Sequence, residues 1–444
     1  MRDPAPAVPA SPPPAHQITR RAVTGWVLYD LANTIFSMGV ISLLFPLWVR
    51  DVVGAERADA RYGVITAISM GIIFLLSPLL GAMTDRARTR MPFLMVSTVI
   101  CVALTTLLGR GPFMMTAILF IIANAAYQAG LQFYDALLPE VSTPENRGRI
   151  GGIGVGVGYF GSYIAVGLSI FVKTDSKPFL FTLYAIAFLL FSIPCLLFVK
   201  ERGNANPRPI NLAAMVDSLR CTYDALRHSQ KFPGLLRFLV GRVFYTDAIN
   251  TVINIMVLYT VNVAIASGLS KDAGEGRAKL IMLFAITFAI AGGFAWGWLA
   301  DKIGPRRTLR HVLHFWMGIF ILAALVGILK LPLLFMFIVA ALAGFALGGV
   351  WAADRPFMLR LTPPDRIGEF YGLYGMVGRF SAITGPIVWA IVTSALIKGG
   401  ATPLMAQGIA VLVLLVLVVV SYVILRPVSD EPAARLSSGQ PQQK

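Results

Sequence analysis

Long apolar runs recur along the whole chain and limit it to folds that sit in a lipid bilayer. A helix of about 20 apolar residues crosses the roughly 30 Å hydrocarbon core of a membrane. Hydrophobic residues make up 57% of the chain and charged residues 14%, with a mean hydropathy of +0.73, so lipid must cover most of the surface. We predict an all-α membrane protein of about twelve transmembrane helices, which begin near Gly25, Tyr62, Phe93, Pro112, Ile150, Phe179, Arg242, Lys279, Leu309, Leu331, Gly368 and Pro403.

Basic residues lie mainly in the short segments between these runs. A net charge of +16 could suggest nucleic acid, but nucleic-acid binders gather Lys and Arg on one soluble face, so we expect no such partner. With both termini in the cytoplasm, about 25 of the 38 Lys and Arg are cytoplasmic and about 11 are not, in accord with the positive-inside rule. We expect a multi-pass protein of the bacterial inner (plasma) membrane with both termini cytoplasmic.

Polar segments divide the chain into five parts. Residues 1–23 are rich in Pro and Ala and lack the apolar region of a signal peptide, which favours a disordered cytoplasmic tail. We expect two six-helix halves at 24–199 and 238–426, a cytoplasmic linker at 200–237 and a second cytoplasmic tail at 427–444. The three cysteines form no spaced framework that would indicate disulfides.

Motifs of the first half return in the second half. The segment YDLANT, which contains Asp30, is echoed about 217 residues later by YTDAINT, which contains Asp247. GAMTDRARTR is echoed by GWLADKIGPRR, and Asp135 with STPENRG by Asp354 with LTPPDRIG, all at offsets of about 216 to 220. Three echoes at one offset indicate two parallel six-helix repeats, which is the arrangement of the major facilitators.

Polar side chains inside the apolar runs indicate where a solute crosses, because a polar group in hydrocarbon is costly unless it faces a cavity or a partner. In the first, fourth and seventh helices they are spaced three or four apart and share one helix face, and the tenth helix ends with Asp354 and Arg355. These helices surround the central cavity in the major facilitator arrangement. The candidate substrate-binding residues are Asp30, Asn33, Asn124, Gln128, Gln132, Asp247, Asn250, Asn254 and Arg379.

Arg379 is the least expected charge in the chain. It lies about 17 Å along the eleventh helix, too deep for its side chain to reach an interface easily. One interpretation makes its guanidinium an anchor for a carboxylate or phosphate of the substrate. The other is structural: a permanent ion pair, or hydrogen bonds to backbone carbonyls where helices meet.

Asp30 and Asp247 are candidates for proton coupling. Burial raises the affinity of a carboxylate for a proton, and a nearby cation lowers it again. The alternative is that each Asp is a hydrogen-bonding residue that fixes the start of its helix, with the Asn three residues later as its partner. Both interpretations agree with the duplication.

Two loops carry acid–base patterns that we assign to gating. Asp85 with Arg86, and Asp301 with Arg306 and Arg307, lie where an acid can cap a neighbouring helix and hold basic residues while the halves rock. The glycine-rich run GGIGVGVGYFG lacks the strand that a dinucleotide site requires, so we expect it to serve close helix packing. His311 and His314 lack further metal ligands nearby, so no metal site is expected.

Three segments resemble a known family. GWVLYDLANTIFSMGVISLLFPLWV, QFYDALLPEVSTPENRGRIGGIGVGVGYFG and LTPPDRIGEFYGLYGMVGRFSAITGP are similar to the bacterial branch of the vacuole-effluxer-like major facilitators, which include relatives of the autophagy-related amino-acid effluxer. The resemblance covers about residues 25–426. GWLADKIGPRRTL is also similar to the general major facilitator loop signature, but the first-half copy has Ala87 where a Gly is usual.

The resemblance and the polar residues together suggest a secondary active transporter that works by alternating access. Its solute is expected to be small and polar, with efflux of amino acids or similar zwitterions favoured, driven by a proton gradient or by the gradient of the solute itself. The alternatives are a cation-coupled sugar symporter and a receptor or lipid-handling protein that does not transport. No nucleophile or redox motif indicates an enzyme or a cofactor, and the expected partners of the monomer are a small solute and the bilayer.

Overall fold

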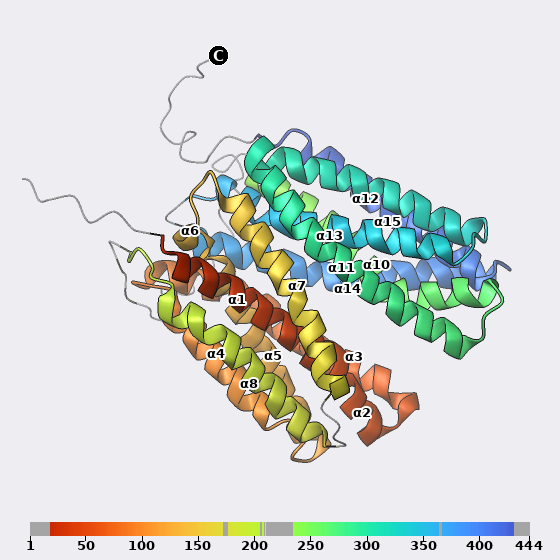
Figure 1. The fold of residues 1–444 in the computed structure, drawn as a ribbon, viewed down its shortest axis with the longest axis horizontal. Coiled ribbons are helices and arrows are strands. Elements are labelled where there is room, and N and C mark those ends of the chain that lie inside the picture. Colours follow the sequence, from red (N-terminus) through yellow and green to blue (C-terminus); the bar gives the residue numbers. More distant parts are fainter. Residues whose placement is uncertain are drawn as a thin grey trace, which may run out of the picture.

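The computed structural model describes residues 18–171, 176–204, 207, 209, 234–363 and 366–429, and its elements there are all helices (Figure 1). One bundle contains α1 (Arg20–Phe36), η1 (Ser37–Leu44), α2 (Phe45–Val53), α3 (Ala55–Arg86), α4 (Met91–Thr106), α5 (Phe113–Asp135), α6 (Leu138–Val141), α7 (Arg147–Phe171) and α8 (Lys177–Phe198). The other contains α10 (Leu235–Ala266), α11 (Lys271–Ile303), α12 (Pro305–Ile328), α13 (Leu334–Leu361), α14 (Ile367–Lys398) and α15 (Pro403–Leu425). We call these bundles the N-half and the C-half.

The helices are long and apolar enough to cross a membrane. Within the described residues nine helical segments meet the length and hydropathy expected of a span, and a tenth, α10, does so across a 46° bend. The apolar parts of α4 and α14, Met91–Thr106 and Ile387–Lys398, are shorter. This pattern confirms the predicted all-α membrane fold and is consistent with about twelve spans, one for each predicted start.

The first span is a single long helix that changes its winding. Thr19 caps its N-terminus by accepting a hydrogen bond from the backbone of Ala22 at 3.2 Å. The helix then passes through the π-helical turns of η1 before it continues as α2. The backbone of Gly39 in η1 lies directly against the ring of Tyr184 in α8, where a larger residue would not fit.

The two halves meet along two symmetric helix pairs, α7 with α11 and α3 with α14. Glycines let the backbones touch: a Cβ atom added to Gly152 of α7 would lie 2.6 Å from Cα of Gly297 in α11. In the other pair, a Cβ added to Gly372 of α14 would lie 2.6 Å from the carbonyl oxygen of Ser77 in α3. Close packing therefore explains the glycine-rich run, because small residues remove the steric limit on helix approach.

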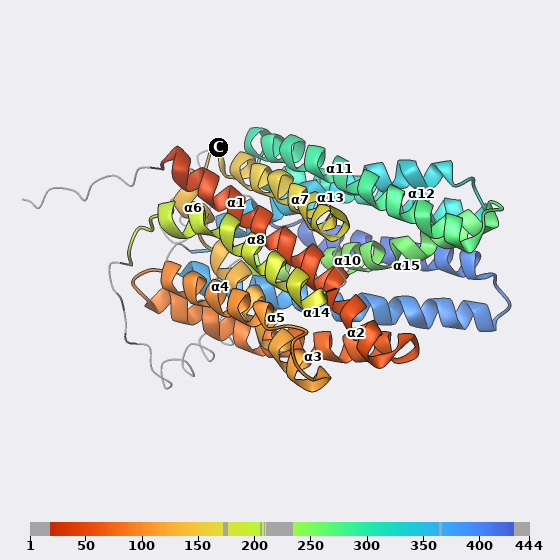
Figure 2. The same ribbon diagram turned by 60° about the horizontal axis from the view of Figure 1, so that its bottom comes forward.

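Both α1 and α15 have their terminal ends at the same end of the bundle (Figures 1 and 2), which we call the termini end. The expected tails and most of the expected linker at 200–237 lie outside the described residues. The exact bounds of the two halves therefore stay a prediction.

Candidate functional site

The most prominent polar feature of the interior is an ion cluster that joins the two halves. Arg355 of α13 contacts two carboxylates of the N-half: its Nη1 lies 3.4 Å from Oδ2 of Asp30 in α1, and its Nε lies 3.1 Å from Oδ1 of Asp135 in α5. The exposed fraction of each of these side chains is between 10% and 13%. One guanidinium thus holds two acids, and the contact must break if the halves separate here.

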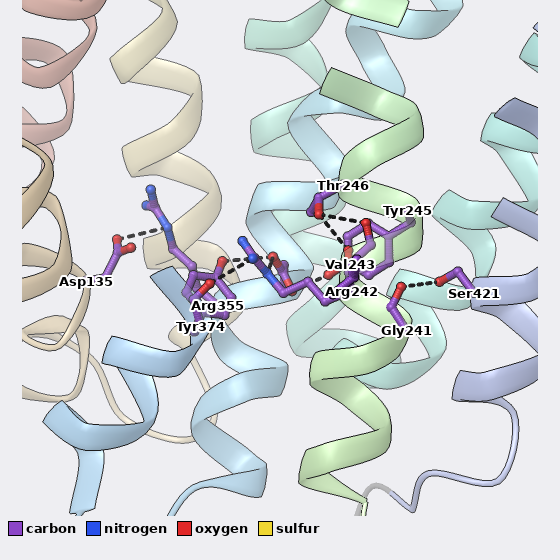
Figure 3. Close-up of polar contacts among 10 residues, drawn as sticks. Asp135, Gly241, Arg242, Val243, Tyr245, Thr246, Arg355, Tyr374 and Ser421 are labelled. Atoms are coloured by element: carbon purple, nitrogen blue, oxygen red, sulfur yellow. Dashed lines mark hydrogen bonds and ion pairs between the residues drawn. The ribbon is translucent and has the colours of Figure 1, made fainter. Parts of the chain in front are cut away.

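A second ion pair lies within the C-half, next to the first (Figure 3). Arg242 of α10 donates from Nε to Oδ2 of Asp354 at 3.0 Å and from Nη1 to the backbone carbonyl of Tyr374 at 2.9 Å. The hydroxyls of Tyr245 and Tyr374 both donate to Asp354, at 2.5 and 2.8 Å. The exposed fractions of Arg242 and Asp354 are 4% and 0%, so this pair is a permanent part of the C-half core.

Arg379 of α14 has a different environment. Its Nη1 donates to the hydroxyl of Ser77 in α3 at 2.6 Å and its Nη2 donates to the backbone carbonyl of Gln128 in α5 at 2.9 Å. The Ser77 hydroxyl in turn donates to the side chain of Gln132 at 2.5 Å. Arg379 is 7% exposed, and its Nε has no hydrogen-bond partner among the described residues.

The partners of the three core arginines therefore differ in charge. Arg242 and Arg355 each contact at least one carboxylate, whereas Arg379 contacts only a hydroxyl and a carbonyl of the described chain. Hydrogen bonds of this kind hold the side chain but do not neutralise it. The guanidinium of Arg379 is thus a buried cation on the N-half face of the C-half.

Two predicted carboxamides lie deep in the N-half. Asn33 of α1 and Asn124 of α5 are 3% and 0% exposed, and their side-chain amides have no hydrogen-bond partner in the described part of the chain. The Tyr127 hydroxyl donates to the backbone carbonyl of Asn33 at 3.1 Å. Such orphaned buried groups point to a water or a ligand group that completes them. Gln128 contributes its backbone carbonyl to Arg379, and Gln132 its side chain to Ser77.

The polar residues predicted for the seventh span lie on α10. Asp247 is buried, and its side chain and that of Thr251 lie against Gly385 of α14. Asn250 is half-buried. Asn254 lies in α10, but its side chain is outside the described residues. Asp30 has the matching position in the N-half, next to the glycines of α7, so the duplication extends to the packing of both carboxylates.

At the termini end, Asp85 joins the end of α3 to the start of α14. Its two oxygens accept the backbone N–H groups of Gly368 and Glu369, each at 2.7 Å. Arg90 donates to the same carboxylate at 2.9 Å. The free N–H groups and the dipole at a helix N-terminus favour a carboxylate at this point, so Asp85 holds the two halves together.

Asp301 makes the equivalent contact with the two halves exchanged: the C-half supplies the carboxylate and the N-half supplies the backbone donor. The carboxylate, near the end of α11, accepts the backbone N–H of Arg149 at the start of α7 at 2.9 Å. Arg86 ends α3, Arg306 donates to the backbone carbonyl of Arg426, directly after α15, at 2.9 Å, and Arg307 is exposed. Both predicted gating acids therefore lie where the two halves meet.

An apolar cavity of about 130 Å³ lies within the C-half beside α7. Its walls come from α10, α11, α12 and α13, with Val252, Ile281, Trp316 and Leu347 among them, and Tyr159 of α7 borders it. The cavity could accept an apolar group but offers few polar atoms to orient it.

Solved structures share this fold. The human organic anion transporter MFSD10 matches with a TM-score of 0.68 at 17% identity, covering 93% of this chain and 100% of that one. A bacterial homologue of the iron transporter ferroportin, in its outward-facing state, matches with a TM-score of 0.71 at 14% identity, covering 92% of this chain and 98% of that one. The fold, with its symmetric halves and buried charges between them, is that of a major facilitator transporter.

Sequence relatives narrow the class to a family. The MFS-type transporter YxiO of Bacillus subtilis (strain 168) is 26% identical over 435 residues, which cover 94% of this chain and 96% of that protein. Autophagy-related protein 22-1 of Penicillium rubens is 25% identical over 268 residues, 55% of this chain and 44% of the fungal protein. The profile described as "Vacuole effluxer Atg22 like" matches residues 49–435. The chain belongs to this family, as predicted; it is a multi-pass membrane transporter and not an enzyme.

The partners within the ion clusters were not predicted. In the sequence Asp354 and Arg355 stand together at the end of one polar helix. In the structure Asp354 pairs with Arg242 of the same half, whereas Arg355 pairs with Asp30 of the other half. One signal was available: the echo aligns Asp135 with Asp354, so Arg355 follows directly after the equivalent position in the second half. Ser77, which accepts a hydrogen bond from Arg379, belonged to no pattern in the sequence.

Proposed function

We propose that this protein exports a small zwitterionic solute, such as an amino acid, across the bacterial plasma membrane by alternating access, with the termini end on the cytoplasmic side and a monomer as the working unit. The observation that carries the proposal is the buried cation of Arg379. A major facilitator binds its solute between its halves near the membrane midplane, and Arg379 of the C-half contacts Ser77 and the Gln128 carbonyl of the N-half.

Arg379 suits a carboxylate for two reasons. Two parallel N–H donors of its planar guanidinium match the two oxygens of one carboxylate. A separate hydroxyl and carbonyl do not offer this paired geometry. A carboxylate that displaces the Ser77 hydroxyl also neutralises a buried charge, and a buried charge is costly when unpaired. The side-chain amide of Gln128, whose backbone carbonyl accepts from Arg379, is half-buried beside this contact and could bind the rest of a polar solute, whereas both ends of the Gln132 amide are bonded to Ser77.

We assign coupling to the cluster of Asp30, Asp135 and Arg355. One guanidinium cannot neutralise two carboxylates, so a proton on either acid leaves a neutral cluster and weakens its hold on Arg355. Because this contact links the halves, its protonation state biases how readily the termini end opens. The candidate Asp30 thereby acts together with Asp135, while Asp247 packs against Gly385 within its own half.

Ligand-induced stabilisation of the purified protein tests the substrate assignment. A ligand that binds only the folded state at 100 times its Kd adds about 2.7 kcal/mol of stability, which appears as a rise in the unfolding temperature. We expect neutral amino acids to produce this rise and their methyl esters, which lack the carboxylate, to produce none. Arg379→Ala should abolish the rise, whereas Arg310→Ala, at the peripheral contact with Tyr422, should keep it.

Other outcomes would replace the assignment. Stabilisation by sugars but not amino acids favours the cation-coupled sugar symporter, and stabilisation by lipids alone favours the receptor or lipid-handling alternative. Amino-acid binding that survives Arg379→Ala unchanged would refute the anchor role of this residue.

A further inference from the structure

A second cavity, of about 460 Å³, lies at the termini end, remote from the apolar cavity. The N-half contributes the loop between α3 and α4, the region of α6, the start of α7 and the segment after α8. The C-half contributes Leu359, Thr362 and Ile367, at the end of α13 and the start of α14. Because both halves form its wall, this cavity exists only while the termini end is closed.

The carboxylates that line this cavity are already bound by the protein. Asp85 accepts from Arg90 and from two backbone N–H groups at the start of α14. Glu201 accepts the backbone N–H groups of Arg90 and Met91 at 2.8 and 2.5 Å and so caps α4. Glu140 accepts the backbone N–H and the Nε of Arg202 at 3.0 and 3.2 Å.

Only some of the guanidinium groups that line the same cavity have a carboxylate partner. Arg90 and Arg202 each pair with one of these acids. Arg88 and Arg147 also line the cavity; the backbone carbonyl of Arg88 accepts from Asn204, but neither guanidinium has an ion pair or a hydrogen bond to any residue that the structure describes. Nε of Arg147 and Nε of Arg90 are buried without an acceptor. The cavity therefore combines satisfied acids with unsatisfied cationic donors.

We propose that this cavity is a regulatory site for a phosphate-bearing anion, held by Arg88 and Arg147. Guanidinium donors suit phosphate oxygens, and the volume of the cavity falls in the range of small-ligand sites. Since the C-half completes the wall, a bound anion stabilises the closed termini end over the open one. The site is separate from Arg379, so it is independent of which solute the protein carries.

The phosphate has two possible sources, the headgroup of an anionic lipid and free phosphate in solution. The experiment uses the full-length protein, purified in detergent and titrated with potassium phosphate against potassium chloride of equal ionic strength. In parallel it is placed in nanodiscs of phosphatidylcholine with or without phosphatidylglycerol. The readout in both arms is the unfolding temperature, together with the distance between spin labels at Pro144→Cys and Lys302→Cys, on opposite halves at the termini end.

The expected result is a saturable stabilisation by phosphate, or by phosphatidylglycerol, with a larger population of the short inter-label distance. The double variant Arg88→Gln/Arg147→Gln should weaken the apparent affinity at least tenfold. Arg110→Gln, an exposed arginine at the opposite end that bonds to Thr182, should not change it. The arm that responds identifies the source.

Three results would overturn the proposal. They are no effect beyond that of chloride in either arm, an equal response in the double variant, and stabilisation without any change in the inter-label distance. If the double variant fails to fold, the single variant Arg88→Gln provides the same test, because Arg88 is exposed and its guanidinium makes no hydrogen bond or ion pair with the described residues. A failure of amino-acid binding would leave this result unaffected, since the two sites share no residue.

Discussion

Replacing Asp85 by Asn should open the termini end of the transporter. The carboxylate accepts two backbone N–H groups of α14 at 2.7 Å, and both contacts cross between the halves. An amide keeps one acceptor oxygen but presents an NH₂ group to the second N–H, and it also loses the charge that interacts with the helix N-terminus. The contact with Arg90 lies within the N-half and is weakened in both states, so the change should shift the balance through the closed state.

The magnitude follows from the hydrogen bond that is lost. A hydrogen bond to a charged group contributes about 1.5 to 3 kcal/mol, and Asp85 is only 11% exposed, so solvent replaces little of it in the closed state. If the termini end is open the N–H groups are hydrated, and the substitution has little effect there. The ratio of open to closed molecules should rise about 10- to 150-fold.

Pulsed electron paramagnetic resonance measures this ratio. Labels at Pro144→Cys and Lys302→Cys, in a background without native cysteines, should shift from a mainly short distance to a mainly long one in Asp85→Asn. Glu275→Gln, which neutralises an exposed acid of α11 far from the contact, provides the control. An unchanged distance distribution in Asp85→Asn, or an equal shift in Glu275→Gln, would refute the reasoning.

Three further predictions concern packing and charge. Asp354→Asn should cost about 3 to 5 kcal/mol of unfolding free energy because it leaves Arg242 buried and unpaired, and an apolar replacement of both residues should restore much of this loss in a denaturant titration. Gly152→Leu should abolish transport without preventing membrane insertion, whereas Gly318→Leu, which has open space around its Cβ position, should transport normally in the same assay. Burial raises the pKa of Glu201 above its ordinary value of 4.5, so the wild type should lose stability relative to Glu201→Gln as the pH rises from 4.5 through the raised pKa, as followed by thermal unfolding at each pH.

The sequence predicted the fold well because its evidence is repetitive and local. Apolar runs set the number and length of the helices, and the echo of Asp30 by Asp247 at one offset indicated two parallel halves. The glycines that were expected to bring helices together do so, as Gly152 and Gly297 illustrate. These features depend on helix geometry and on the bilayer, which the chain itself encodes.

The pairing of charges was harder to predict, because it depends on how two halves pack in three dimensions. Asp354 and Arg355 are consecutive, and consecutive residues point about 100° apart around a helix, so they meet different neighbours. Arg379 bonds to Ser77, 302 residues earlier in the chain. No periodicity in a single helix indicates such a partner.

Transport by proteoliposomes tests the central claim most directly. Purified protein is reconstituted, the vesicles are loaded with a radiolabelled neutral amino acid, and its release is followed with and without an imposed proton gradient. We predict release that depends on the protein, is lost in Arg379→Ala, and responds to the gradient less in Asp135→Asn than in the wild type. Release that is equal in protein-free vesicles, or that persists unchanged in Arg379→Ala, would contradict the claim.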